Sequence, residues 1–196
     1  AVPQIIQQWQ VALSERWLAV AIQSDKQWHV HWVSRDRPLQ NFTQELDGSG
    51  QLLLLPSVRT ALWYKEGEVV FASTDSHQRI YTDRPVEKVS AFPDHKAVLI
   101  GLEGGEVQKW SSFNQQGQFI YQQIYTLPEP VSLQQMQMVS GKDLGVILTR
   151  NQELLLFLGS TGEILQRQSL SQPGRSFLLA GNKLFMQHQQ SIEQWQ

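Results

Sequence analysis

The sequence predicts an all-β fold, a β-propeller of about five four-stranded blades. A short pattern recurs along the chain: an apolar strand, a tight polar turn, and a second strand with an aromatic or apolar side chain near its end. The turns fall at residues 25–26, 66–67, 104–105, 150–151 and 189–190. Their centres are roughly 40 residues apart, which is the period of four-stranded propeller blades. We expect residues 1–196 to form a single propeller domain.

The first unit shows the alternation of a half-buried strand. Residues 17–22 form an apolar run that leads into the turn. After the turn, Trp28, Val30 and Trp32 alternate with polar residues, which indicates a strand with one buried face.

The other units supply the remaining predicted strands. These are residues 61–64, 69–71 and 78–82; residues 89–92, 97–102, 107–110 and 119–125; residues 136–139, 145–149, 154–158 and 164–170; and residues 177–180, 184–187 and 192–195. In the third unit, Gly104 and Gly105 can adopt the positive φ angles that a two-residue hairpin requires. The fifth unit lacks a fourth strand.

The incomplete fifth unit leaves two arrangements open. In one, the apolar segment at residues 5–9 completes the last blade, closes a five-bladed ring and removes two exposed sheet edges. In the other, the array continues in flanking sequence and forms a ring of about six to eight blades. The last residues stop within an expected strand, and we therefore expect a domain cut from a longer protein.

Composition excludes several function classes. The formal net charge is -2 and 17% of the residues are charged, so the chain has no general field for nucleic acid or an anionic membrane. No cysteine is present, which excludes disulfides, thiolate metal sites and a cysteine nucleophile. No apolar run approaches the ~20 residues that span a bilayer.

Glutamine is used heavily, at about one residue in seven. Pairs occur at residues 7–8, 115–116, 122–123, 134–135 and 189–190, dispersed between apolar residues. This dispersion predicts solvated strand faces and turns, not a prion-like tract.

The third unit resembles a known family. Residues 92–101 read Phe-Pro-Asp-His-Lys-Ala-Val-Leu-Ile-Gly, and residues 103–110 read Glu-Gly-Gly-Glu-Val-Gln-Lys-Trp. They are similar to a WD-repeat blade, or to the related quinoprotein-like blade, in which a Pro-Asp turn precedes the second strand and a Gly-containing turn precedes a third strand ending in Trp. The approximate equivalents of Trp110 in the other units are Trp32, Phe71, Phe157 and Trp195. The Gly-His pair of the family is missing, and Ser111 stands where Asp would follow Trp110, so the resemblance implies a divergent propeller without the buried Asp–His network.

The sequence predicts no catalytic, cofactor-binding or metal-binding residues. His29 and His31 are two apart on a strand and share a face that could hold a metal, but no third ligand is near in sequence, so we interpret them as the polar face of that strand. Asp94 and His95 are interpreted as a turn. Gly101, Gly104 and Gly105 lack the Lys-Ser or Lys-Thr of a phosphate cradle. No spacing of Ser, His and Asp indicates a triad.

These observations predict a non-catalytic protein-binding or scaffolding propeller that binds no nucleic acid. The more specific expectation is a periplasmic or other extracytoplasmic domain, tethered to a membrane within a bacterial protein such as a transport permease. The alternative is a cofactor- or sugar-binding propeller, quinoprotein-like or lectin-like, although the repeated acidic partner of a lectin tryptophan does not recur. The candidate recognition loops are residues 35–38, 83–85 and 128–130, because loops on a rigid scaffold carry recognition.

Overall fold

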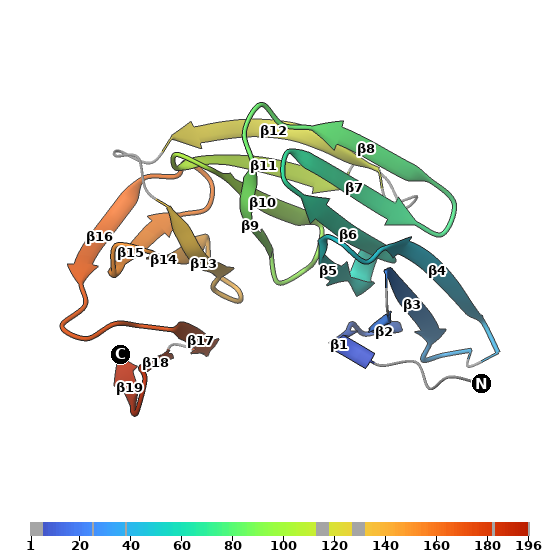
Figure 1. Cartoon of the computed structure of the whole chain (residues 1–196), viewed down its shortest axis with the longest axis horizontal. Helices are drawn as coiled ribbons and strands as arrows, with labels where there is room; N and C mark the ends of the chain where they lie inside the picture. Colours follow the sequence, from blue (N-terminus) through green and yellow to red (C-terminus); the bar gives the residue numbers. More distant parts are fainter. Residues whose placement is uncertain are drawn as a thin grey trace. The chain divides into compact units, whose positions relative to one another are not determined.

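The protein consists almost entirely of antiparallel sheets. The computed structural model describes residues 6–24, 26–37, 39–112, 118–126, 132–181 and 183–195. Within these residues lie nineteen strands and one short 3-10 helix, and the strands form five sheets in which sequence neighbours pair with one another (Figure 1). The all-β prediction is therefore confirmed.

Each sheet is a meander of consecutive strands. The sheets contain β1 (Ile6–Leu13), β2 (Trp17–Ser24), β3 (Gln27–Ser34) and β4 (Asn41–Asp47); β5 (Gln51–Leu55), β6 (Thr60–Lys65), β7 (Glu68–Ser73) and β8 (His77–Tyr81), with the 3-10 helix η1 (Pro56–Val58) between β5 and β6; β9 (Val86–Ala91), β10 (Ala97–Leu102), β11 (Glu106–Ser112) and β12 (Phe119–Thr126); β13 (Leu133–Met138), β14 (Leu144–Thr149), β15 (Glu153–Leu158) and β16 (Ile164–Ser169); and β17 (Ser176–Ala180), β18 (Lys183–Gln187) and β19 (Ile192–Trp195).

The five recurring turns have one structural role. Each joins the second strand of a sheet to the third, as β6 joins β7 through residues 66–67. The predicted equivalents of Trp110 all lie in the third strand of their sheets, where Trp32, Phe71 and Phe157 are buried. The repeat in the sequence is therefore one repeated hairpin with an aromatic residue on its second strand, and that ring is buried in three of the five sheets.

The N-terminal segment does not complete the last sheet. It forms β1, which pairs with β2 in the first sheet, with Val11 opposite Val20 and Leu13 opposite Leu18. Of the two arrangements that the sequence left open, closure of the last blade by this segment is not found among the described residues. The last sheet has three strands within the described residues.

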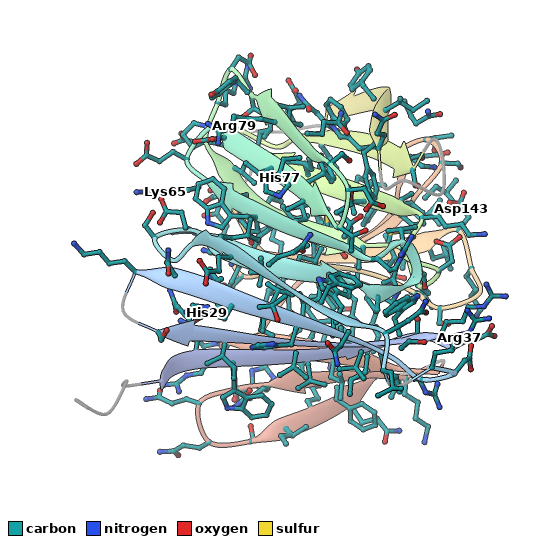
Figure 2. The ribbon with its side chains drawn as sticks, turned by 90° about the vertical axis from the view of Figure 1, so that its right-hand side faces the viewer. His29, Arg37, Lys65, His77, Arg79 and Asp143 are labelled. Carbon is teal, nitrogen blue, oxygen red and sulfur yellow. The ribbon has the colours of Figure 1, made fainter. Side chains whose placement is uncertain are left out.

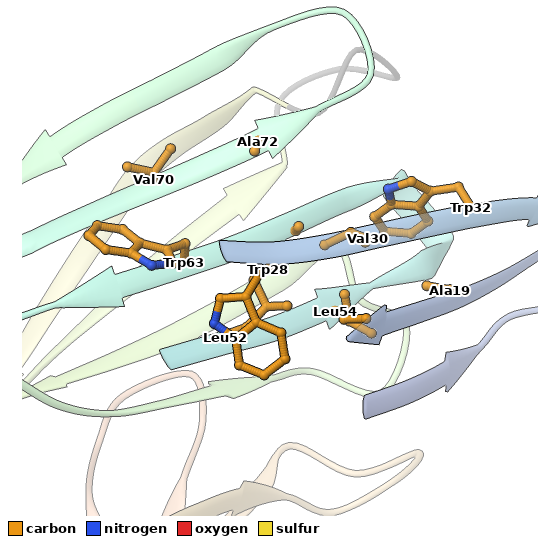
Figure 3. Close-up of a cluster of buried hydrophobic side chains, with 11 residues drawn as sticks. Ala19, Trp28, Val30, Trp32, Leu52, Leu54, Trp63, Val70 and Ala72 are labelled. Carbon is orange, nitrogen blue, oxygen red and sulfur yellow. The ribbon is translucent and has the colours of Figure 1, made fainter. Parts of the chain in front are cut away.

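The chain divides into two compact units. Unit 1 comprises Ala1–Pro85, Asp94–Lys96 and Ser111–Ile120, and unit 2 comprises Val86–Pro93, Ala97–Trp110 and Tyr121–Gln196. In unit 1, the first and second sheets bury one hydrophobic cluster between them (Figure 3). Its members include Trp28, Trp32, Leu52, Leu54 and Trp63. The tryptophans of these two sheets thus serve mainly as core.

In unit 2, glycines allow close packing in the core. A Cβ at Gly101 would lie 2.2 Å from Cδ1 of Leu133, and a Cβ at Gly145 would lie 2.3 Å from the ring of Phe157. Leu133 and Phe157 belong to one buried cluster. These two positions require the smallest residue because the neighbouring side chain occupies the space of a Cβ.

Several glutamines join one sheet to the next. In unit 1, the side-chain amide of Gln78 donates to the carbonyl of Phe119 (2.6 Å) and accepts from its N–H (2.8 Å). In unit 2, Gln135 makes the same paired contact with Phe177, and Gln134 donates to the carbonyl of Arg175 (2.7 Å). The pair at residues 134–135, predicted as a solvated strand face, is half-buried and also bonds to the next sheet. An amide matches a peptide group in both directions, which lets these side chains satisfy backbone groups that a sheet leaves unpaired.

The first strand exposes a row of apolar side chains. Trp9, Val11 and Leu13 alternate along β1 and keep 70%, 53% and 56% of their surface exposed. Residues two apart in a strand share a face, so the three side chains form one strip. On an edge strand, such a strip favours association with other apolar surfaces.

Candidate functional site

One end of unit 1 gathers loops from three sheets. We call the set of residues 14–16, 35–37, 39–40, 56–59 and 94–96 the loop face. The β1–β2 and β3–β4 loops share an end of the first sheet, since antiparallel strands alternate in direction. The segment η1 lies against β1 and β2, and Ser57 at its centre shares a 3.1 Å hydrogen bond with Nδ1 of His95. Loops far apart in the sequence are thereby brought together.

The β3–β4 loop is held at both ends. The hydroxyl of Ser34 accepts from the N–H of Arg37 (3.1 Å), and the N–H of Gln40 donates to the carbonyl of Arg37 (2.8 Å). The guanidinium of Arg35 donates to the carbonyls of Ser14 (3.0 Å) and Glu15 (3.1 Å). These bonds fasten the loop to the neighbouring β1–β2 turn.

An apolar side chain stands at the tip of this fastened loop. Leu39 is 98% exposed, the largest exposed fraction among the large hydrophobic side chains of the described residues. Its neighbour Arg37 is exposed as well and points outward from the end of the first sheet opposite the end that carries His29 (Figure 2). A fixed loop that presents leucine to solvent has the form of a recognition element.

An arginine and two aromatic rings support the centre of the loop face. Arg59 follows η1 in the left-handed conformation (φ 51°), and its guanidinium carbon lies 5.4 Å from the ring centroid of Trp17. The Trp17 ring packs edge-on against Phe42, with centroids 5.6 Å apart. The cation is therefore positioned by contacts that continue into the core.

The β9–β10 turn contributes His95. The carboxylate of Asp94 accepts from the N–H of Lys96 (2.9 Å), which is the predicted turn, and His95 takes φ 58°. Burial lowers the pKa of His95 from its ordinary value of 6.5, against the opposing effect of the Asp94 carboxylate. No carboxylate orients the His95 ring among the residues that the structure describes, so the Ser57–His95 contact has the form of a link between loops.

The lowered pKa of His95 predicts a pH dependence of stability. The native state favours the neutral ring, so the stability it confers is fully present above pH 6.5 and is lost as the pH falls from 6.5 through the folded-state pKa. We expect the free energy of unfolding to decrease over this range. His95→Asn should reduce the decrease, because the imidazole that takes up the proton is gone. Asn is chosen because it tolerates the positive φ of this position. Urea titrations at several pH values test this, with exposed His77→Asn as control. Equal slopes in both variants would contradict it.

The loops predicted for recognition do not all lie at the same end of the structure. Residues 35–37 join the loop face, whereas residues 83–85 adjoin the β6–β7 turn at the opposite end, where the hydroxyl of Thr82 donates to the carbonyl of Arg84 (2.6 Å). Residues 128–130 and Pro38 lie outside the described residues. His29 and His31 alternate with buried residues as predicted.

A second candidate site is an open depression near the β2–β3 turn. Its lining includes Lys26, His29, Glu45 and Asp47, with Nδ1 of His29 3.5 Å from Oε1 of Glu45. A hydrogen bond from the N–H of Ser49 lowers the pKa of Asp47. In the described part of the chain, no group of three His, Asp or Glu side chains is arranged to hold a metal ion. Charges of both signs lie close together here and select no particular ligand.

Comparison with known proteins identifies the fold. Hsv2 from Kluyveromyces marxianus superposes with a TM-score of 0.70 at 11% identity, covering 98% of this chain and 65% of that chain. Hsv2p from Kluyveromyces lactis gives 0.65 at 11% identity, covering 94% and 64%, and the Myceliophteria thermophila Cps50 (Swd1) β-propeller domain gives 0.64 at 10% identity, covering 93% and 67%. These likenesses show the fold, a β-propeller, as predicted.

The comparisons define the fold alone. The chain spans about 65% of the length of the Hsv2 structures that it matches. No protein-family model matches the chain, and no curated protein matches it in sequence. Across the described residues, no helix has the length and apolar character needed to cross a membrane.

Proposed function

We propose that this propeller is a non-catalytic scaffold that binds a protein partner through the loop face. The observation that carries the proposal is Leu39, 98% exposed on a loop that Ser34 and Arg35 fasten in place. A loop already ordered in the free protein loses little conformational entropy on binding, and this favours affinity. Apolar groups at the centre of a contact, surrounded by polar ones, are typical of protein interfaces.

The sugar-binding alternative receives less support from the same structure. Of the repeated third-strand aromatic residues that could stack on sugars, Trp32, Phe71 and Phe157 are at most 1% exposed, and Trp110 and Trp195 are half-buried. A buried ring cannot serve as a platform for a ligand. Exposed Leu39 and the arginines around it favour a protein partner instead.

The more specific expectation, an extracytoplasmic domain tethered within a membrane protein such as a transport permease, stays a prediction from the sequence. The extracytoplasmic location needs a test of its own. Protease added to intact spheroplasts should digest this domain in the full-length protein if it faces outward, and digestion only after lysis would reject that location.

Site-directed cross-linking tests the proposed protein contact. We expect benzoylphenylalanine at position 39 to give one discrete protein adduct in cells of the source organism. The same group at Leu165, 47% exposed on β16, is the control and should not give it. The adduct is identified by mass spectrometry, and the purified partner should bind Leu39→Ser at least roughly fivefold more weakly. Identical adducts at both positions, or none at position 39, would reject the loop face as a binding site.

A further inference from the structure

The loop face has a chemistry that selects among protein partners. Resting on the proposed function, we propose that the loop face binds an acidic protein segment that also carries an apolar side chain. The carboxylates of that segment would meet the arginines of the loop face, and the apolar side chain would meet Leu39.

The first argument is the local excess of positive charge. The loop face holds five cationic residues and three carboxylates, although the whole chain has a formal net charge of -2. The cations are Arg16, Arg35, Arg37, Arg59 and Lys96. The loop face thus has a local excess of positive charge, and this end of unit 1 favours an anionic partner.

The second argument is that three of these cations have no ionic partner among the residues that the structure describes. Within the described residues, no carboxylate forms a salt bridge with Arg16, Arg37 or Arg59. Arginines on the strand faces are paired, with Nε of Arg79 3.1 Å from Oε1 of Glu68, for example. An unpaired guanidinium keeps its planar set of donors for a carboxylate.

The third argument is the fixed position of the charges. The Trp17 ring supports the Arg59 guanidinium at 5.4 Å, and Arg35 is anchored on the carbonyls of Ser14 and Glu15. Of the three carboxylates, Asp94 already accepts the N–H of Lys96. Two of the five cationic groups, Arg35 and Arg59, are therefore held in place before any partner arrives.

A protein segment fits this surface better than nucleic acid does. Single-stranded nucleic acid requires exposed aromatic rings on which bases stack. Here the half-buried Trp17 ring is engaged by Arg59 and Phe42, and the exposed apolar group is a leucine. Leucine complements an apolar side chain, and arginine complements Asp or Glu.

Fluorescence anisotropy with three short probes tests this proposal. The first peptide alternates Asp and Glu with Leu, the second replaces Leu with Ser, and the third replaces the acids with Lys. We expect the first to bind most tightly, and to weaken by roughly tenfold between low and high salt, since exposed charge pairs are screened. The double variant Arg16→Gln/Arg37→Gln should bind it roughly two- to tenfold more weakly. The matched control, Arg79→Gln/Arg167→Gln, removes paired arginines on strand faces and should leave binding unchanged.

Other outcomes overturn the proposal. Equal binding of the acidic and basic peptides would reject it, as would equal losses in the two double variants. Tighter binding of a single-stranded RNA, or of phosphatidylserine–phosphatidylcholine vesicles, would assign the surface to that class of ligand. If the position 39 cross-link persists while the acidic peptide fails to bind, the loop face is a protein-binding site with another specificity, and only this inference fails.

Discussion

Replacing Trp32 with alanine is expected to cost about 3–5 kcal/mol of folding free energy. Trp32 is fully buried, its ring stacks on Phe42 with centroids 6.0 Å apart, and its indole N–H donates to Oε1 of Gln44 (3.1 Å). The substitution leaves a cavity between the first two sheets, and it also removes the donor of the glutamine oxygen, which adds about 1 kcal/mol. Small domains have total stabilities of about 5–15 kcal/mol, so the variant should be close to unfolded.

Urea denaturation followed by circular dichroism measures this effect. Trp32→Phe is an informative second variant, because it keeps most of the ring and loses the N–H. We expect it to lose roughly 1–2 kcal/mol. Trp9→Ala is the matched control, since Trp9 is 70% exposed and should change stability by less than about 0.5 kcal/mol. A similar loss for Trp9→Ala and Trp32→Ala would contradict the core assigned to unit 1.

The sequence was sufficient to predict the repeated hairpins, because they follow local rules. Each hairpin is contained in one unit of roughly 40 residues, with its apolar strands and its polar turn. The third-strand aromatics Trp32, Phe71 and Phe157 each lie in a unit of their own. Strand β4 was harder to recognise. Its alternating residues include Gln44, which looks solvated in the sequence but donates its amide to the carbonyl of Ser73 in the next sheet.

Pairing between distant segments could not be predicted in this way. The N-terminal segment is apolar enough to serve as a strand in either the first or the last sheet. In the structure it pairs with β2, with Val11 opposite Val20. Gln10 adds a bond to the carbonyl of Leu52 in the second sheet (3.0 Å). Neither contact leaves a local signal in the sequence, since both depend on how the sheets pack.

The loop face was only partly predictable for the same reason. Residues 35–38 could be recognised as a loop from their charges and proline. Ser57 and His95 are 38 positions apart, in loops of the second and third sheets, and their contact depends on how those sheets pack. Two contacts that no local pattern records thereby define the candidate site: Ser57 with His95, and Arg59 with Trp17.

The glutamines that join sheets should be sensitive to replacement by glutamate. In unit 2, the Gln135 amide donates to the carbonyl of Phe177 at 2.8 Å and accepts from its N–H at 2.9 Å, and Phe177 is 5% exposed. Gln135→Glu keeps the size and the acceptor but places a carboxylate oxygen against a carbonyl oxygen. The carbonyl loses its donor, and we expect a cost of about 2–4 kcal/mol at pH 7.

Protonation distinguishes this mechanism from a general loss of packing. A protonated carboxyl can again donate to the Phe177 carbonyl, so the native state of Gln135→Glu favours the protonated form and the pKa of the introduced group should rise. Its deficit relative to the parent protein should therefore be small near pH 4 and grow as the pH rises to about 7. The exposed Gln168→Glu on β16 should show no such growth. If urea titrations give both variants the same deficit at every pH, the amide of Gln135 does not hold the two sheets together.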